Sequence, residues 1–282
     1  MKFSLVMPTV GRVTEPQRFL HSLRAQTHKN FEVIIVDQNA DERLARIVAQ
    51  ASALFDVTHL RLHGLGASHA RNIGLRAACG EVITFPDDDC WYGEPTLLER
   101  AAAILARQPG LGAVTGRAFD ENGRPCQLRW RARASQLNRF NVWRLAVEFT
   151  IFARREVFRT VGEFDEHLGP PWSAGEGTDL LIRALEARFR IDYAPDLVVH
   201  HPNPVVVHDE RARRRAYSYS VGFGRTLRKN NYPAAAVAYH CARPAAAAIV
   251  ALLLGNRRKA GYQWAATRGK LIGWLRPGPD AV

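Results

Sequence analysis

Short apolar runs alternate with amphipathic segments along the first 120 residues of the chain. Residues 31–36 are β-branched and mostly apolar, as is typical of a strand that is covered on both faces. Strands are predicted at residues 3–7, 31–36, 57–62, 81–85 and 112–119. Helices are predicted between them, at residues 15–26, 41–54, 67–78 and 95–107. This alternation predicts an α/β fold with a mostly parallel sheet and right-handed crossovers.

The pattern is less regular from residue 129 to residue 202. Residues 129–144 are rich in arginine and aromatic side chains, which indicates a loop or a short helix over a site. Further elements are predicted as strands at residues 147–153, 191–193 and 197–200 and as a helix at residues 175–189. From residue 209 onward the pattern is helical, with breaks predicted near Pro233, Pro244 and Gly255. We therefore expect an α/β domain over residues 1–205 and a helical extension over residues 206–282.

Composition changes this picture mainly through the distribution of charge. The 282 residues are 47% apolar and 23% charged, as in an ordinary folded protein. Residues 1–200 hold 25 Lys and Arg against 24 Asp and Glu, whereas residues 201–282 hold 14 against 3. Nearly all of the net charge of +12 therefore belongs to the extension. This asymmetry predicts a near-neutral body and a basic appendage that faces an anionic surface, either a membrane or a nucleic acid.

The four cysteines form neither a CxxC pair nor a zinc-like spacing, and nothing in their placement indicates a disulfide framework. A reduced, cytoplasmic compartment is therefore expected. The apolar run at the start of the chain is too short for a signal peptide, and it is interpreted as the first strand.

Three adjacent aspartates, Asp87-Asp88-Asp89, directly follow the fourth predicted strand. Burial of three carboxylates beside an apolar strand is very costly unless a cation neutralises them. In an extended segment, Asp87 and Asp89 would point to the same side. Mg²⁺ or Mn²⁺ is commonly held by one or two carboxylates together with substrate phosphates. We therefore predict a divalent-metal site here in preference to a solvated acidic turn.

Polar residues also lie near the ends of two other predicted strands, where they would suit a ligand such as a nucleotide-sugar. Asp37 follows the second predicted strand, and Arg71 and Asn72 lie on the third predicted helix. Ligands of open α/β sheets bind at the carboxyl ends of the strands. Arg71 could pair with a diphosphate through its planar fork, or it could lie on the surface of its helix. The stretch Gly64-Leu65-Gly66 follows the third strand rather than the first, so it is not interpreted as a dinucleotide-binding fingerprint.

Five short motifs occur in the order that is found in family 2 glycosyltransferases of the GT-A fold. They are Leu5-Val6-Met7-Pro8-Thr9, Val36-Asp37-Gln38-Asn39, Ala70-Arg71-Asn72-Ile73-Gly74, Phe85-Pro86-Asp87-Asp88-Asp89 and Gly175-Glu176-Gly177-Thr178-Asp179. The chain resembles this family over about residues 3–202, and within it the bacterial exopolysaccharide and other cell-surface polysaccharide enzymes. The resemblance implies an inverting, metal-dependent transfer of a sugar from a nucleoside-diphosphate sugar to an acceptor.

The resemblance also implies roles for residues in these motifs. Asp37 is expected to contact the base or ribose of the donor, Arg71 the base or diphosphate, and Asp87 the ribose. Asp89, the last residue of the DxD triplet, is expected to bind the divalent cation, with Asp87 beside it. The remaining donor-site positions that the motifs supply are Pro8, Asn72 and Asp88.

A late histidine commonly provides a further metal or diphosphate contact in this family. His200 and His201 are the two candidates in this chain, and we prefer His201. The family's catalytic base usually belongs to a Glu-Asp pair that opens a helix, but here glycine takes the second position of the pair. Glu176 and Asp179 remain as candidate bases, both in the first helical turn, where the helix dipole favours their ionised form.

Trp172 and Ser173 lead into the glycine-rich turn before these two carboxylates. Their presence favours a role in the site over two simple charges at a helix N-terminus.

The pattern of the extension favours helices that lie at a membrane surface over a purely solvated basic surface. Its apolar stretch could be a core helix, a re-entrant helix or an interfacial helix. Residues 234–254 are almost all apolar, but Arg243 and Pro244 interrupt them, and residues 244–254 alone are too short to span a bilayer. Trp264, Leu271 and Leu275 share one helical face among several basic residues, which is typical of an anionic membrane interface. An acceptor such as a polyprenyl-diphosphate-linked sugar would account for this tail. A peripheral location on the cytoplasmic face of the cell membrane is therefore expected.

Two other classes of protein are weighed against this interpretation. A non-enzymatic protein that binds nucleic acid or a membrane would account for the charge but not for the aspartate triplet, and the sequence contains no nucleic-acid-binding module. No nucleic-acid partner is therefore expected. A sugar nucleotidyltransferase would need a glycine-rich, basic phosphate loop soon after the first strand, and Pro8-Thr9-Val10-Gly11-Arg12 is a poor version of one.

Overall fold

The computed structural model describes residues 1–169, 174–203 and 207–276. The chain divides into two compact units, which are described separately. The sheet unit comprises Met1–Phe164 and Leu180–Asn203, and the helical unit comprises Asp165–Asp179 and Pro204–Val282. The segment Asp165–Asp179 thus groups with the C-terminal helices, although the sequence pattern places it inside an α/β domain over residues 1–205.

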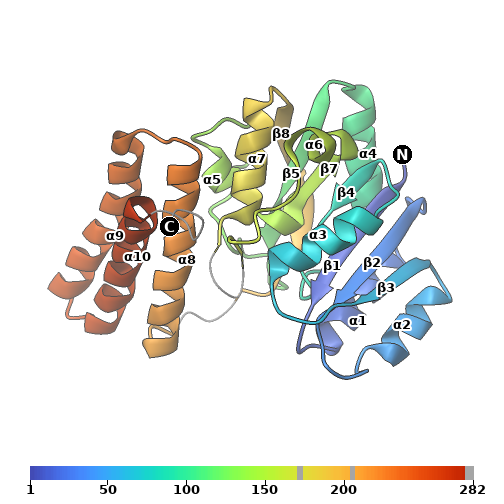
Figure 1. The fold of residues 1–282 in the computed structure, drawn as a ribbon, viewed down its shortest axis with the longest axis horizontal. Coiled ribbons are helices and arrows are strands. Elements are labelled where there is room, and N and C mark those ends of the chain that lie inside the picture. Colours follow the sequence, from blue (N-terminus) through green and yellow to red (C-terminus); the bar gives the residue numbers. More distant parts are fainter. Residues whose placement is uncertain (170–173, 204–206, 277–282) are drawn as a thin grey trace. The chain divides into compact units, whose positions relative to one another are not determined.

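The sheet unit is built on one eight-stranded sheet of order β3-β2-β1-β4-β7-β5-β8-β6 (Figure 1). Its strands are β1 (Phe3–Thr9), β2 (Phe31–Asp37), β3 (Asp56–Arg61), β4 (Val82–Thr84), β5 (Leu111–Phe119), β6 (Ser135–Gln136), β7 (Ile151–Arg154) and β8 (Arg190–His200). Among the strands of the described residues, only β6 and β7 pair antiparallel to their neighbours. The predicted α/β class with a mostly parallel sheet is therefore confirmed.

Helices follow most of these strands. They are α1 (Thr14–Leu23), α2 (Ala45–Ser52), α3 (Ala67–Ala77), α4 (Leu97–Arg107), α5 (Val142–Leu145), α6 (Arg155–Val161) and α7 (Glu176–Glu186), with a 3₁₀ turn, η1, at Glu148–Thr150. The first four residues of α7 are counted with the helical unit. Phe3, Leu5 and Met7 of β1 join Phe19 and Leu23 of α1 in one buried apolar cluster. Side chains alternate across a strand, so the intervening Val6 points to the opposite face. There it meets α3.

Helix α3 approaches the sheet closely because residue 74 is glycine. A Cβ atom at this position would overlap the side chain of Val6 and would lie 3.1 Å from Cγ2 of Val36. Both valines are buried in the sheet. The spacing between α3 and strands β1 and β2 is therefore set by the missing side chain of Gly74.

A buried carboxylate ties β1 and β2 to the turn between α3 and β4. Glu32 forms an ion pair with Lys2 at 2.8 Å and accepts hydrogen bonds from Ser4 Oγ and from the backbone N–H of Cys79. Desolvation would raise the pKa of Glu32, but these partners together lower it below its usual value. The ionised form is thus stabilised in the fold.

Two predicted strand boundaries are wrong. Residues 191–193 and 197–200 belong to the single strand β8, although Pro195 lies within it. The pairing of β8 with β5 is irregular between Thr115 and Arg117, which leaves Pro195 outside the ladder. A Cβ atom on Gly116 would overlap the backbone of Leu197, so glycine permits the bulge. Residues 147–153 are only half strand, because η1 occupies their first part.

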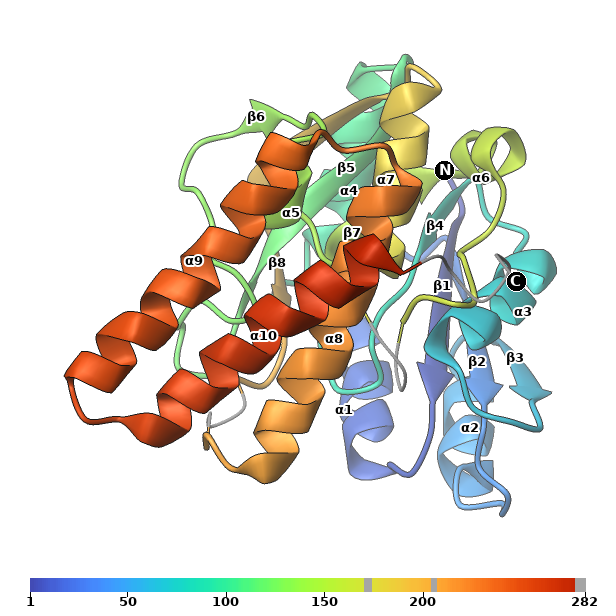
Figure 2. The ribbon, with the colours of Figure 1, turned by 60° about the vertical axis from the view of Figure 1, so that its left-hand side comes forward.

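The helical unit contains α8 (Glu210–Lys229), α9 (Ala234–Leu253) and α10 (Arg257–Leu275), and α9 and α10 run side by side (Figure 2). The breaks near Pro233 and Gly255 are observed, but the break predicted near Pro244 is wrong, because α9 continues through it. A proline inside a helix leaves the carbonyl four residues earlier without its helical donor. Here that carbonyl, on His240, accepts a hydrogen bond from Lys270 Nζ at 3.2 Å.

Helices α8 and α10 pack at short range through glycines. A Cβ atom on Gly269 or on Gly273 would overlap the backbone of α8, at Tyr217 and at Val221 respectively. The spacing of four residues places both glycines on one face of α10, which lets the two backbones approach. The three helices therefore form a compact unit in which the exposed faces of α9 and α10 point away from this packing.

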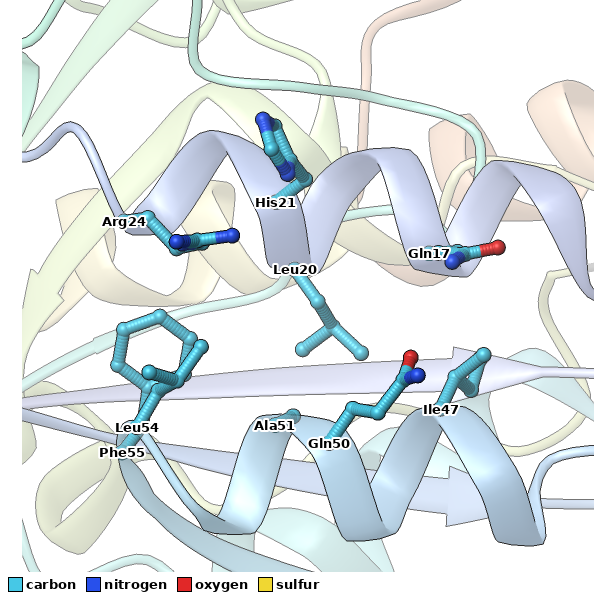
Figure 3. A pocket seen from close by; sticks show the side chains of 9 residues that line it. All are labelled: Gln17, Leu20, His21, Arg24, Ile47, Gln50, Ala51, Leu54 and Phe55. Carbon is cyan, nitrogen blue, oxygen red and sulfur yellow. The ribbon is translucent and has the colours of Figure 1, made fainter.

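A pocket in the sheet unit lies between α1 and α2 (Figure 3). Leu20, Ile47, Leu54 and Phe55 supply apolar walls, and Gln17, His21, Arg24 and Gln50 line its rim together with Ala51. None of the residues singled out by the sequence motifs lines this pocket.

Candidate active site

The sheet unit brings several predicted site residues to one edge of its sheet. β1 ends at Thr9 and β2 ends at Asp37, and the aspartate triplet follows the end of β4. These three strands are parallel neighbours, so their carboxyl ends meet at the same edge. β8 is parallel to β5, and it ends at His200, directly before His201. This is the edge at which open α/β sheets bind their ligands.

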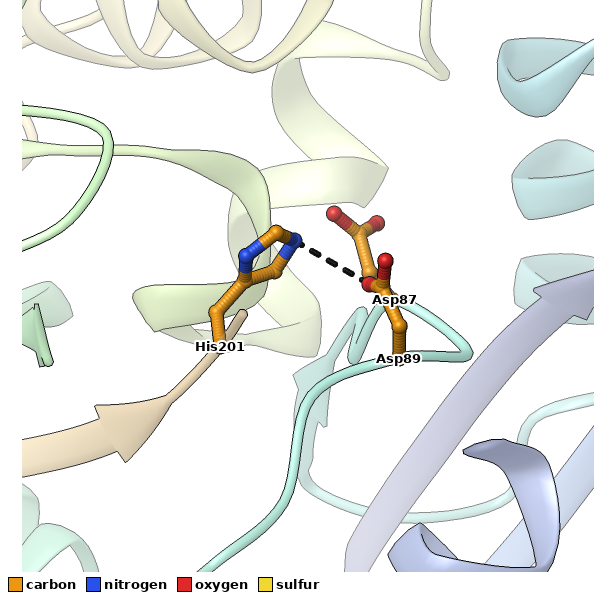
Figure 4. A group of neighbouring side chains, drawn as sticks. All are labelled: Asp87, Asp89 and His201. Carbon is orange, nitrogen blue, oxygen red and sulfur yellow. Dashed lines mark ion pairs between the residues drawn. The ribbon is translucent and has the colours of Figure 1, made fainter. Parts of the chain in front are cut away.

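Asp87, Asp89 and His201 converge at this edge (Figure 4). One ligand atom from each lies within 4.8 Å of the others, and His201 Nε2 lies 3.0 Å from Asp89 Oδ1. The triplet is not extended as expected, because the N–H of Cys90 donates to the carbonyl of Asp87 at 3.1 Å and closes a turn. The turn, rather than strand alternation, aims the carboxylates of Asp87 and Asp89 at the histidine.

The position of His201 is fixed by its backbone and its ring. Its N–H donates to the carbonyl of Phe119 at 2.9 Å, and its ring stacks on Phe149 with 4.8 Å between ring centres. Nδ1 lies 2.7 Å from the carbonyl oxygen of Pro202, which makes Nδ1–H the donor there. Nε2 is then the nitrogen that faces the two carboxylates, and such backbone support is typical of histidines that bind metals.

The charges in this cluster shift one another's protonation. Desolvation raises the pKa of Asp87 to about 6, against the opposing effects of Arg71 and His201. Desolvation would also raise the pKa of Asp89, but the hydrogen bond from His201 and the charges of His201 and Arg12 lower it overall. Burial opposes the charge on His201, yet Asp89 and Asp87 raise the pKa of this histidine above its usual value. Without a cation, the imidazolium form of His201 partly balances the acidic pair.

Two carboxylates and one imidazole suit a divalent cation such as Mn²⁺ or Mg²⁺. Hard oxygen ligands are preferred by Mg²⁺ and Mn²⁺, and a single imidazole is compatible with Mn²⁺. A set of three protein ligands leaves coordination positions for substrate oxygens. The residues present therefore fit the cation that the motifs predict.

The second aspartate of the triplet faces protein groups instead. Asp88 accepts a hydrogen bond from Thr9 Oγ1 at 2.8 Å and forms an ion pair with Arg12. Arg12 also reaches Asp89 Oδ2 at 2.8 Å. Asp88 thus anchors the turn to the loop after β1. Arg12 was not predicted as a site residue, although its position four residues after Pro8, just beyond the first strand, is the signal that marks it.

Asp37 is buried at the end of β2 among three partners. Its carboxylate accepts hydrogen bonds from the backbone N–H and the side-chain amide of Asn39, at 2.9 and 2.7 Å. His59 Nε2 lies 3.0 Å from its other oxygen, and Arg61 lies 3.3 Å away. Pro8, on the neighbouring strand, is buried opposite Val36. The contacts of Asp37 and Pro8 with a donor nucleotide stay predictions.

Arg71 is not a surface residue of its helix. Only 3% of it is exposed, and its guanidinium pairs with Asp87 Oδ1 at 2.9 Å. Asn72 is buried beside it and bonds to the backbone of Phe164 in both directions, at 3.0 and 2.9 Å. Arg71 therefore belongs to the acidic cluster, whereas the hydrogen bonds of Asn72 with Phe164 tie α3 to the segment after α6.

Glu176 and Asp179 belong to the helical unit. Both are buried in the first turn of α7. Asp179 Oδ2 pairs with Lys229 Nζ at 3.0 Å, and its Oδ1 accepts a hydrogen bond from the side-chain amide of Asn230 at 2.9 Å. Lys229 also pairs with Asp165 at 2.7 Å. The end of α8 thus fixes the carboxylate of Asp179. The sequence did not predict this contact. Trp172 and Ser173 lie outside the described residues.

Comparison with known protein families shows to which family the chain belongs. The model of the family described as glycosyl transferase family 2 matches residues 4–162, which is more than half of the chain. The chain belongs to glycosyl transferase family 2. The predicted family is therefore confirmed, and the predicted enzyme class, a glycosyltransferase, is the class of that family.

Curated family 2 relatives match parts of the chain. An uncharacterized glycosyltransferase of Haemophilus influenzae is 35% identical over 113 residues, which cover 39% of this chain and 37% of that protein. Glycosyltransferase AglE of Haloferax volcanii is 25% identical over 207 residues, which cover 71% of this chain and 66% of AglE. The matching part thus spans less than two thirds of the length of either relative.

Solved structures share the fold over nearly the whole chain. The mannosyltransferase PcManGT of Pyrobaculum calidifontis, solved with GDP-Man and Mn²⁺, superposes with a TM-score of 0.67 at 21% identity and covers 96% of this chain and 87% of its own. Residues 1–349 of TarS from S. aureus, solved with UDP-GlcNAc, give a TM-score of 0.62 at 18% identity and cover 96% and 91%. The predicted GT-A fold is confirmed.

Proposed function

We propose that this chain is an inverting, metal-dependent glycosyltransferase that moves a sugar from a nucleoside-diphosphate sugar to a saccharide acceptor. The observation that carries the proposal is the convergence of Asp87, Asp89 and His201 at the ligand-binding edge of the sheet. Such a cluster accounts for the aspartate triplet, which a membrane-binding or nucleic-acid-binding protein would not need. The solved neighbours with GDP-Man and Mn²⁺ and with UDP-GlcNAc support a nucleotide-sugar donor and a cation of this kind.

Different site residues are proposed to contact different parts of the donor. A divalent cation at the cluster would neutralise charge that develops on the departing nucleoside diphosphate. Asp89 and His201 would hold it, with Asp87 beside them. Arg71 and Arg12 already lie against the carboxylates and add fixed positive charge at the same edge. Asp37, buried at the end of β2, is the proposed partner of the base or ribose.

The acceptor hydroxyl must lose a proton as it attacks C1 of the sugar. Glu176 or Asp179 is the proposed general base. Both oxygens of Asp179 already accept contacts from the end of α8, so this carboxylate is fixed in orientation. Glu176→Gln and Asp179→Asn, compared for turnover with donor binding retained, decide between them. The general base is the residue whose substitution lowers turnover without a change in donor affinity.

A lipid-linked saccharide in the synthesis of surface polysaccharide is the proposed acceptor, and the cytoplasmic face of the cell membrane is the proposed location. Helix α9 is long and apolar enough to cross a membrane by length and composition, and only 22% of its apolar window is buried. TarS of Staphylococcus aureus, a relative by sequence over 37% of this chain, is named poly(ribitol-phosphate) β-N-acetylglucosaminyltransferase, and this name supports a polymeric acceptor.

The proposal is tested by a nucleotide and metal screen. UDP, GDP and dTDP are each added with Mn²⁺ or with a chelator, and the thermal unfolding temperature is recorded. A nucleoside triphosphate with a sugar phosphate, and a nucleic acid, are added in parallel samples. The proposal expects one nucleoside diphosphate to raise this temperature only in the presence of the cation. A response to nucleoside triphosphate and sugar phosphate instead would favour a nucleotidyltransferase, and a response to nucleic acid alone would favour a binding protein. Turnover is then measured with the matching radiolabelled sugar donor and a membrane lipid extract.

A further inference from the structure

The end of α9 exposes an unusual concentration of large apolar side chains. Within six residues, Ile249, Val250, Leu252, Leu253 and Leu254 are 59%, 54%, 57%, 82% and 79% exposed. We name these five residues the α9 tip. Single exposed apolar residues are normal on soluble proteins, but contiguous apolar patches mark interaction sites. By contrast, Val237 and Pro244 of α9 are buried.

Positive charge directly follows the α9 tip. Arg257, Arg258 and Lys259 are exposed at the start of α10, after the turn at Gly255. The chain contains no acidic residue between Glu210 and Asp280, and all 14 Lys and Arg of residues 201–282 lie in that interval. No acidic side chain of α9 or α10 is therefore present to balance the basic turn. The apolar α9 tip, together with adjacent basic side chains that have no acidic neighbours in α9 or α10, is complementary to a bilayer with anionic headgroups.

The exposed face of α10 has the same mixed character. Trp264, Leu271 and Leu275 are 55%, 44% and 52% exposed. They recur at helical spacing with Arg257 and Arg268, both exposed, so apolar and basic side chains share one face. Tryptophan is enriched where an apolar medium meets water. Helices α9 and α10, which pack against each other, thus both expose large apolar side chains with basic side chains nearby in the sequence.

Penetration of α9 is limited by a charge on its outer face. Arg243 is exposed ten residues before Leu253. At 1.5 Å per residue, these two residues are about 15 Å apart along the helix axis. A spanning orientation would place Arg243 in the hydrocarbon core, which is costly. Insertion of the tip alone leaves Arg243 and the basic turn at headgroup level, within reach of phosphates.

We propose that the α9 tip, the basic turn 257–259 and the exposed face of α10 form a docking surface for an anionic lipid bilayer. The apolar side chains enter the interface between headgroups and acyl chains, the cations contact lipid phosphates, and α9 does not span the bilayer. The surface deepens the proposed membrane association by naming its residues and its lipid chemistry. It does not depend on the transfer reaction.

Vesicle sedimentation of the full chain tests the proposal. The vesicles consist of phosphatidylcholine alone or of phosphatidylcholine mixed with phosphatidylglycerol. We expect binding to the anionic vesicles that weakens as salt rises. The variant Leu253→Gln/Leu254→Gln should bind at least about tenfold more weakly, because two exposed leucines lose their apolar contact. The variant Arg257→Ser/Arg258→Ser/Lys259→Ser should lose on the order of a hundredfold on anionic vesicles only.

Matched controls remove the same chemistry elsewhere. Leu54→Gln/Leu65→Gln deletes two leucines of the sheet unit that are 55% and 58% exposed. Arg100→Ser/Arg107→Ser/Arg124→Ser deletes three exposed arginines of the sheet unit, with the same change in net charge. Both controls should bind vesicles like the wild type. All substituted side chains are exposed, so each variant should keep the wild-type unfolding temperature.

Three results would overturn the docking surface. The tip variant could sediment with anionic vesicles as the wild type does. Light scattering could instead reveal a dimer that the tip variant abolishes, which would make a second copy of the chain the occupant. Resistance of vesicle-bound protein to alkaline carbonate extraction would show that α9 spans the bilayer. The response to nucleoside diphosphate with Mn²⁺ is recorded for the same variants, so that failure of docking is distinguished from failure of the proposed transfer activity.

Discussion

Substitution of Gly74 by alanine tests the close approach of α3 to the sheet. In an open helix, glycine to alanine is favourable by about 0.5–1 kcal/mol, because alanine loses less backbone entropy. At Gly74 the new Cβ would overlap Val6 and lie 3.1 Å from Val36. Overpacking of a buried contact costs about 1–3 kcal/mol. The overlap outweighs the helix propensity, so we expect a net loss of about 1–2 kcal/mol.

A matched position in α10 predicts the opposite sign. A Cβ atom on Gly261 would have its nearest neighbour at 3.7 Å, an ordinary contact with the stem of Arg213. Gly261→Ala should therefore stabilise its unit by about 0.5–1 kcal/mol. Scanning calorimetry of both variants measures the difference. One kcal/mol shifts the unfolding temperature by about 2–4 °C for a unit the size of the sheet unit and by about 4–8 °C for one the size of the helical unit. Stabilisation by Gly74→Ala to the same extent as by Gly261→Ala would refute the close contact.

A double-mutant cycle identifies the partner of the overlap. Val6→Ala removes the methyl groups that the new Cβ would meet, although it costs stability by itself. Gly74→Ala should be at least about 1 kcal/mol less harmful in the Val6→Ala background than in the wild type. Arg71 lies three residues earlier on α3, so the single variant should also weaken donor binding.

Three further predictions concern protonation and the end of α8. The pKa of Asp87 is raised to about 6 and that of His201 is also raised. Both groups must lose a proton to bind a cation, so Mn²⁺ affinity in calorimetric titrations should increase as the pH rises through about 6 and above. A pH-independent affinity would contradict this. Lys229→Met should lower turnover without loss of donor affinity, because Asp179 loses a partner 3.0 Å away, and Lys229→Arg should restore part of it. The pKa of Glu32 is lowered in the fold, so its stabilisation is complete above about pH 5 and is lost as the pH falls below about 4.5. The stability advantage of the wild type over Glu32→Gln, measured by urea unfolding, should shrink over that range.

The sheet edge was predictable because its signals are local. The apolar runs before Asp37 and Asp87 predict strands, and the polar residues after them fall at the carboxyl ends of parallel neighbours. The role of Asp88 was not predictable in the same way. A turn in place of an extended segment directs this carboxylate to Thr9 and Arg12, which are 79 and 76 residues away along the chain. Contacts of that range leave no periodic trace in the sequence.

Both errors at prolines have a tertiary cause. Pro195 normally argues against a strand interior, but a bulge opposite Gly116 accommodates it. Pro244 normally ends a helix, but Lys270 supplies the hydrogen-bond donor that the His240 carbonyl lacks. In each case a distant residue satisfies the backbone where the local rule predicts a break. The contacts of Asp179 with the end of α8 are of the same long-range kind.

The measurement that tests the central claim most directly is the metal dependence of the Asp89→Ala variant. Asp89 is one of three groups whose ligand atoms lie within 4.8 Å of one another, and its loss removes a charged cation ligand. Two measurements compare this variant with the wild type and with Glu121→Ala, a control that removes an exposed carboxylate of the same unit. They are the unfolding temperature with nucleoside diphosphate and Mn²⁺, and the turnover of the matching sugar donor. We predict that Asp89→Ala loses the Mn²⁺-dependent rise in unfolding temperature and at least about a hundredfold in turnover, whereas Glu121→Ala keeps both. Full turnover and an unchanged response to Mn²⁺ in Asp89→Ala would contradict the assignment of this edge as the metal and donor site.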